Sequence, residues 1–187
     1  MWPIGPLMHE HRLIERMLAV LGQEIASLEA GDQPDLEFIG QAAEFFRAYA
    51  DRCHHGKEED ILFRELKKIE LSPELAGIMA ELEEEHRQGR ARVGAVLEAR
   101  QRLAQGQREA LPQLLEGLKW LVGFYPVHIQ KEDKHFFFPV MEYFDAGAKA
   151  AMLAEFQRFD QELVHEFFRQ RVEIWESGRG RVPPTGR

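Results

Sequence analysis

The sequence predicts an all-α fold, built as an up-down-up-down four-helix bundle with an additional C-terminal fifth helix. Apolar residues recur at steps of three and four almost throughout the 187 residues, which places them on one face of a helix. No stretch alternates apolar and polar residues for long enough to favour a strand. Short turn-forming segments separate the long apolar stripes, and short connections join antiparallel neighbours in a bundle.

The first helix is expected from about Pro6 to Ala30, where Gly31 provides a stop signal. Its apolar stripe contains Leu7, His11, Ile14, Leu18, Leu21, Ile25 and Leu28. After a turn over residues 31–34, the second helix is expected over about 35–70. Its stripe includes Ile39, Ala43, Phe46, Ala50, His54, Glu58 and Ile61.

The third helix is predicted to open with Ser72 as its N-cap and Pro73 at the first helical position. Its stripe contains Leu75, Met79, Leu82, His86, Gly89, Val93, Val96 and Leu103, and Gly106 marks its end. The fourth helix is expected over about 109–144. Its stripe contains Leu111, Leu114, Leu118, Leu121, Tyr125, His128 and Glu132.

Residues 1–146 are thus expected to form the bundle, and residues 147–176 a further amphipathic helix. The face of this helix carries Met152, Phe156, Phe159, Leu163, Phe167 and Ile174. It either packs on the bundle or forms a contact in a homodimer. The tail over residues 177–187 is rich in Gly, Arg and Pro, a composition that predicts disorder.

Composition excludes several functional classes. The formal net charge is -8 and no basic stripe is present, so nucleic acid is not an expected partner. No apolar run approaches the roughly 20 residues of a membrane span. The N-terminus lacks the pattern of a signal peptide, and a single cysteine permits no internal disulfide. A cytoplasmic protein is the expectation.

Each of the four main stripes contains a histidine where an apolar residue is expected, namely His11, His54, His86 and His128. Glu58 and Glu132 follow two of these histidines by four residues, which puts each pair on one helix face. Singly, such a histidine is more often a hydrogen-bonded core residue, and such a pair is often an exposed salt bridge. As a set, four interior imidazoles and two interior carboxylates would be very costly to bury without a shared metal partner.

The types of donor atom narrow the choice of metal. Nitrogen and carboxylate oxygen without thiolate suit Fe, Mn or Zn, whereas structural zinc more often recruits cysteine. Two carboxylates can bridge two ions, and carboxylate-bridged pairs in helical bundles are typically di-iron or di-manganese. The sequence therefore favours two non-haem iron ions, with Mn or Zn as substitutes.

The order of these motifs resembles the hemerythrin-like family, also called the HHE cation-binding domain. The matching stretches are Glu10-His11-Arg12, His54-His55-Gly56-Lys57-Glu58-Glu59, Glu85-His86-Arg87 and His128-Ile129-Gln130-Lys131-Glu132. The resemblance covers about residues 6–145 and implies a four-helix bundle around a carboxylate-bridged di-iron centre. It assigns terminal ligand roles to His11, His54, His86 and His128, and bridging roles to Glu58 and Glu132.

Two departures separate this chain from the oxygen-carrying hemerythrins. Arg90 stands where those proteins have a second third-helix histidine. Their last carboxylate ligand is an Asp five residues after the fourth-helix histidine, whereas here it is Glu132, four residues after His128. Both resemble the branch that includes iron-sulfur-cluster repair proteins and iron- or oxygen-responsive domains. That branch sometimes uses the residue after the second-helix histidine, which makes His55 a candidate seventh ligand. Arg90, Tyr125 and His135 are candidates for supporting roles around the metals.

The expected function is binding of a small diatomic molecule, O2 or NO, or of peroxide, in sensing, stress response or iron handling. The alternative is a di-iron enzyme that reduces peroxide or NO, oxidises Fe(II) or repairs iron-sulfur clusters. No catalytic residue can be assigned from the sequence.

Overall fold

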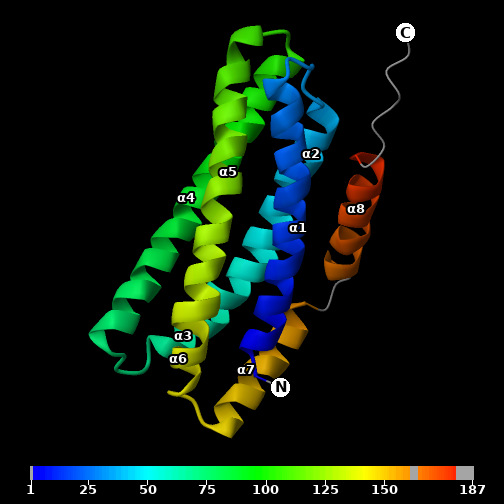
Figure 1. Ribbon diagram of the computed structural model, residues 1–187. Coiled ribbons are helices and arrows are strands. Elements are labelled where there is room, and N and C mark those ends of the chain that lie inside the picture. The colour runs from blue at the N-terminus through cyan, green and yellow to red at the C-terminus, as the bar shows by residue number, and fades with distance from the viewer. Residues whose placement is uncertain (1, 161–163, 180–187) are drawn as a thin grey trace.

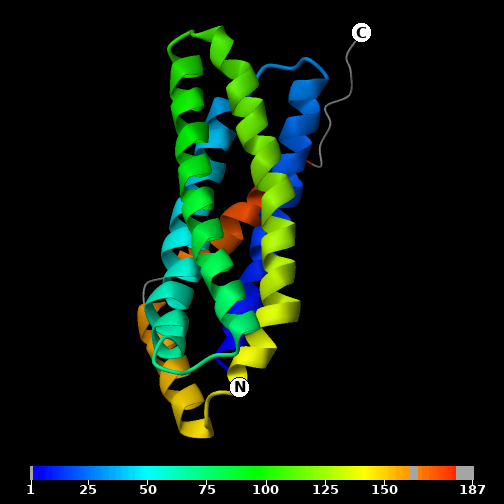
Figure 2. The same cartoon turned by 90° about the vertical axis from the view of Figure 1, so that its left-hand side faces the viewer.

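Four long helical segments run side by side, and consecutive segments run in opposite directions (Figures 1 and 2). The structure is a computed structural model that describes residues 2–160 and 164–179. Within these ranges every regular element is a helix, which confirms the predicted all-α class. The four segments are α1 (Ile4–Glu29); α2 (Leu36–Phe45) continued by η1 (Phe46–His55), η2 (Glu58–Phe63) and α3 (Arg64–Leu66); α4 (Pro73–Ala104); and, after the short turn η3 (Arg108–Ala110), α5 (Leu111–Lys131) continued by η4 (Glu132–Phe136) and α6 (Phe137–Met141).

Local sequence signals set the helix ends as predicted. Gly31 and Gly106 adopt φ values of 96° and 84°, the left-handed conformation that ends a helix and that glycine adopts without steric cost. Ser72 caps α4, because its Oγ accepts a hydrogen bond from the backbone N–H of Leu75 at 3.3 Å. Asp35 caps α2 in the same way through the N–H of Phe38 at 2.9 Å.

The second and fourth segments contain π-helical turns where the sequence predicted continuous α-helix. These turns are η1, which contains His54, η2, which begins at Glu58, and η4, which begins at Glu132. A π-helical turn spans one more residue than an α-helical turn, so it shifts the side chains that follow it around the helix axis. In η1 this accompanies the burial of the two consecutive histidines His54 and His55.

A polar layer divides the interior into two apolar cores. One core includes Ile14, Phe46, Val93 and Leu121. The other contains side chains from the opposite end of the same segments, including Leu7, Ile61, Leu82, Phe136 and Phe137. Between the two cores, the buried polar residues are Glu10, His11, His54, His55, Lys57, Glu58, His86, His128 and Glu132.

The C-terminal region differs from the single helix predicted over residues 147–176. It forms two helices, α7 (Ala146–Phe159) and α8 (Val164–Arg179), with residues 161–163 outside the described part of the chain. The predicted apolar face is therefore not continuous. Met152 and Phe156 are buried, whereas Phe159 and Ile174 are exposed; Leu163 and the side chain of Phe167 lie outside the described residues.

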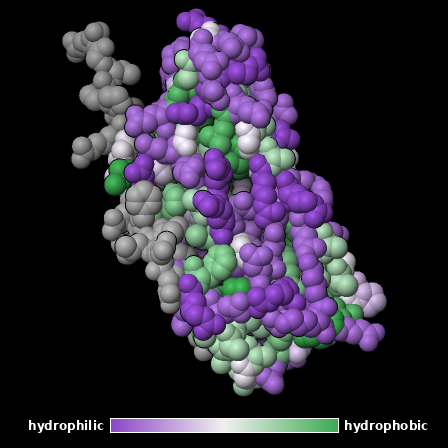
Figure 3. Space-filling model, turned by 180° about the vertical axis from the view of Figure 1, so that it is seen from behind, coloured by the Kyte–Doolittle hydropathy of each residue, from purple (hydrophilic) through white to green (hydrophobic). Residues whose placement is uncertain are grey.

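The two C-terminal helices lie against the bundle. Helix α7 packs against η2, and α8 packs against α1 and η1. Helix α8 includes Ser177–Arg179, which the sequence assigned to the disordered tail, and residues 180–187 lie outside the described residues. The face shown in Figure 3 is mainly hydrophilic. Among the described helices, none combines the length and apolarity needed to cross a membrane.

Candidate metal centre

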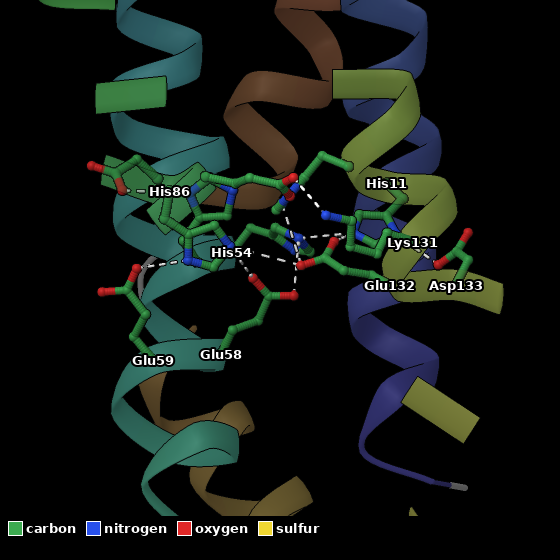
Figure 4. Close-up of polar contacts among 12 residues, drawn as sticks. His11, His54, Glu58, Glu59, His86, Lys131, Glu132 and Asp133 are labelled. Carbon is green, nitrogen blue, oxygen red and sulfur yellow. Dashed lines mark hydrogen bonds and ion pairs between the residues drawn. The ribbon is translucent and has the colours of Figure 1, made fainter. Parts of the chain in front are cut away.

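Seven side chains from all four long segments converge in the polar layer. Figure 4 shows how His11, His54, Glu58, His86 and Glu132 lie in it. Each of the seven is at most 2% exposed. Their nitrogen and oxygen atoms fall into two groups, within each of which the atoms lie no more than 4.8 Å apart. The first group is His11, His54, Glu58 and Glu132, and the second is His55, His86 and His128. The six residues predicted as ligands are thus brought together, and His55 joins them.

Glu132 lies between the two groups and turns one oxygen toward each. Its Oε2 is 3.1 Å from His11 Nε2 in the first group. Its Oε1 is 3.3 Å from His128 Nε2 and 3.7 Å from His86 Nε2 in the second. A carboxylate with its two oxygens divided in this way has the arrangement of a bridging ligand.

Glu58 also turns one oxygen toward each group. Its Oε1 is 3.5 Å from His54 Nε2, and its Oε2 is 3.4 Å from His86 Nε2. The first group therefore presents four donor atoms, two imidazole nitrogens and two carboxylate oxygens. The second presents three imidazoles and the other two carboxylate oxygens.

The inward-facing polar atoms lack hydrogen-bond partners among the described residues. They are both oxygens of Glu58 and Glu132, Nε2 of His86 and His128, and both ring nitrogens of His55. Leaving a buried polar atom unsatisfied costs about 1–3 kcal/mol, so a folded protein rarely concentrates such atoms in one place. His11 Nε2 and His54 Nε2 also lie 2.9 Å apart. Carboxylates and imidazoles arranged in this way fit metal cations, which accept lone pairs from the carboxylate oxygens and from the one unprotonated nitrogen of each imidazole.

Four of the five histidines are each oriented by a different acidic side chain, which contacts the ring nitrogen that faces away from the centre. His11 Nδ1 lies 2.8 Å from Asp133 and His54 Nδ1 lies 2.8 Å from Glu10. A carboxylate accepts, so each Nδ1 donates its proton to the acid, and the neutral form of each ring then presents a lone pair on Nε2 to the centre. Metal-binding histidines are usually held in this way.

The other two pairs complete a ring of contacts. His86 Nδ1 donates to Glu59 at 2.7 Å, and His128 Nδ1 donates to Glu85 at 2.8 Å. Each acid lies beside a candidate ligand in the sequence but supports the histidine of the next segment. The series runs from Glu10 on the first segment to His54 on the second, and closes from Asp133 on the fourth back to His11.

A cation pairs with each supporting acid. Arg12 contacts Asp133 at 2.5 Å, Arg90 contacts Glu59 at 2.6 Å, and Lys131 contacts Glu85 at 2.7 Å. The fourth cation, Lys57, contacts Glu10. Burial would raise the pKa of Glu10, but its interactions with His54 and Lys57 outweigh burial and lower it.

The pKa values around the centre are shifted in opposite directions. Burial and the neighbouring Glu132 carboxylate raise the pKa of Glu58 well above its usual value. Burial alone would lower the pKa of His11, but the neighbouring Asp133 and Glu132 carboxylates outweigh it and raise the pKa to about 9. Burial and the charge of His11 lower the pKa of His54 to about 4, so that ring is neutral. A bound cation would take the place of protons on His11 and Glu58.

The three residues predicted to support the centre have different positions. Arg90 donates hydrogen bonds to Glu59 and Asp51, so it contacts His86 only through Glu59. Tyr125 is 2% exposed, stacks on His55 at 6.4 Å between ring centroids, and lines a cavity of about 300 Å³ beside that histidine. His135 is exposed and belongs to neither group. Its position therefore argues against the predicted supporting role.

The supporting acids and Lys57 were missed by the sequence analysis. Glu85 belongs to a run of three glutamates that resembles a solvated helix face. A signal was nevertheless present, because each of the four segments carries an acid directly beside a candidate ligand. These pairs are Glu10-His11, Glu58-Glu59, Glu85-His86 and Glu132-Asp133.

Comparison with known proteins gives one family match. The model of the hemerythrin HHE cation binding domain matches residues 3–137. Uncharacterized proteins from Mycobacterium bovis and from two strains of Mycobacterium tuberculosis are each 27% identical over 127 residues. The match covers 68% of this chain and 49% of each relative, so the aligned region spans about half the length of those proteins. Comparison with solved structures finds no significant match.

Proposed function

Since the chain belongs to the hemerythrin family of HHE cation-binding domains, we propose that it binds two non-haem iron ions and uses them to bind O2, NO or peroxide. Cation binding is the property that the family shares. The family match and the cluster of buried histidines and glutamates support this wider proposal. The proposal also covers the architecture, which is an up-down-up-down four-helix bundle with the two C-terminal helices packed on its side.

The observation that carries the proposal is that the two oxygens of each glutamate face different histidine groups. Glu58 and Glu132 each turn one oxygen to each histidine group, which suits two ions held between shared carboxylates. His11 and His54 would complete the first ion's protein ligands, and His55, His86 and His128 those of the second. His55 takes the place of the third-helix histidine that Arg90 replaces.

The two groups differ in their protein donors. His11, His54 and one oxygen of each glutamate would hold the first ion, whereas three imidazoles and the nearby carboxylate oxygens would hold the second. The position beside His11 and His54, with fewer imidazole donors, is therefore where an exogenous ligand would bind. Iron at such a position supplies reversible redox chemistry and affinity for diatomic ligands, and Mn or Zn would serve as substitutes without that redox range.

Aromatic rings restrict water around the ligands. Phe137 stacks on His11 at 5.7 Å, Phe63 stacks on His86 at 6.0 Å, and Phe124 stacks on His128 at 5.5 Å between centroids. Phe63 and Phe137 are fully buried. An apolar shell lowers the local dielectric and favours small uncharged ligands over hydrated ions.

The test is anaerobic loading of the metal-free protein with Fe(II), followed by an optical spectrum before and after O2, NO or peroxide. Two irons per chain and a ligand-dependent charge-transfer band are expected. Steady-state consumption of peroxide or NO, or net oxidation of Fe(II), would favour the enzymatic alternative over binding alone. Stoichiometric zinc that iron cannot replace would contradict the proposal.

A further inference from the structure

A buried lysine connects the metal centre to the C-terminal helices. Lys57 is 0% exposed and contacts Glu10, whose other oxygen holds His54 at 2.8 Å. The same ammonium group donates to both oxygens of Asp160, at 2.7 and 2.9 Å. Asp160 directly follows α7, outside the residues 3–137 that match the family.

The end of α7 is seated closely enough to maintain this connection. Phe156 is 1% exposed and packs in the apolar core that contains Leu7 and Phe137, so it anchors the last turns of the helix. The ring of Phe159 lies over Gly56, where an added Cβ would come within 2.9 Å of the ring. Glycine between His55 and Lys57 therefore leaves room for the Phe159 ring, which would have to shift if a larger residue stood there.

Lys57 differs from the other three cations around the centre. The side chains of Arg12, Arg90 and Lys131 are 52%, 37% and 22% exposed, so water can replace part of their pairing. Lys57 is shielded from solvent, and a buried ammonium needs nearby carboxylates to offset its desolvation. Removing the Asp160 charge should therefore alter how Lys57 holds Glu10.

We propose that Asp160 is a positioning residue for the metal centre, which acts through Lys57 and Glu10 to fix the imidazole of His54. The C-terminal helix α7 is then part of the site. By linkage, iron bound beside His54 strengthens the docking of α7, and docking of α7 strengthens iron binding by the same factor. This inference rests on the proposed two-ion centre.

The experiment compares Asp160→Asn with Glu155→Gln by anaerobic Fe(II) titration against a competing chelator. Glu155 lies on α7 and pairs with Arg64 of α3 at the surface, so its replacement controls for the loss of an acidic charge and of one exposed contact between α7 and the bundle, which contributes little to stability. Loss of a direct supporting contact typically weakens metal binding about 10–100-fold, as expected for Glu10→Gln. Asp160 acts one contact further away, so Asp160→Asn should weaken the binding of one of the two ions by about 3–10-fold. Glu155→Gln should leave both unchanged.

Hydrogen exchange distinguishes positioning from general stabilisation. In the unaltered chain, iron loading should slow amide exchange over residues 152–159, and this gain should be lost in Asp160→Asn but kept in Glu155→Gln. Equal affinities in the Asn variant and the unaltered chain, or equal weakening of both ions, would overturn the inference. Failure of the unaltered chain to bind two ions would overturn the proposed function as well, so the two failures are distinguishable.

Discussion

Adjacent glutamates on α4 provide a sharp test of the ring of supporting acids. Glu85 accepts from His128 Nδ1 at 2.8 Å and from Lys131 at 2.7 Å, and its side chain is 20% exposed. Glu84 instead pairs at the surface with Arg87 and is 51% exposed. Replacing either residue with alanine keeps a strong helix former in place, so the helix itself is not perturbed.

The two replacements should differ by more than an order of magnitude in metal affinity. Glu85→Ala removes the acceptor that keeps the Nδ1 proton of His128 in place, and such a loss weakens metal binding about 10–100-fold, or about 1.4–2.7 kcal/mol. Glu84→Ala removes an exposed ion pair, which contributes about 0–1 kcal/mol to stability and nothing to ligand orientation.

The assay is anaerobic Fe(II) titration with a competing chelator, together with thermal unfolding of the metal-free proteins. The expected result is weaker binding of one of the two ions in Glu85→Ala, and affinities in Glu84→Ala that match the unaltered chain. Equal affinities in the two variants would refute the supporting role of Glu85 and the ring of contacts that includes it.

Three further predictions follow from the centre. His55→Ala should weaken the ion held by His86 and His128 at least tenfold by removing one of its donors, whereas His135→Ala should change neither ion; titration of both variants decides whether His55 is a ligand. Iron loading at pH 7 should release at least one proton, from His11, whose pKa of about 9 keeps its ring protonated at that pH; a pH indicator in weak buffer measures the release, and release of none would contradict the raised pKa. In the metal-free protein, the His11 pKa of about 9 lies above its ordinary 6.5, so its contribution to stability should be complete below about pH 6.5 and lost as pH rises through 9. Unfolding by urea across that range tests this, with His11→Gln as the control.

The helical class and the convergence of the ligand set follow from side-chain periodicity. A histidine in an apolar stripe is conspicuous, and a spacing of four puts Glu58 and Glu132 on the same faces as their histidines. The helix ends at Gly31 and Gly106 were also predictable, because a left-handed residue there has a strong glycine preference.

Other features depend on tertiary packing and could not be predicted. The π-helical turns around His54 and Glu132 carry no propensity signal of their own. Glu84 and Glu85 are equivalent in composition, and only the position of His128 on the next segment distinguishes them. The contact of Asp160 with Lys57 likewise joins residues far apart in the sequence, and no local pattern encodes it.

Iron-edge anomalous diffraction from crystals of the iron-loaded protein tests the central claim most directly. Two iron peaks are predicted in the polar layer, each within bonding distance of one Glu58 oxygen and one Glu132 oxygen. One peak should also contact His11 and His54, and the other His55, His86 and His128. A single peak, or two peaks that do not share the glutamates, would contradict the account.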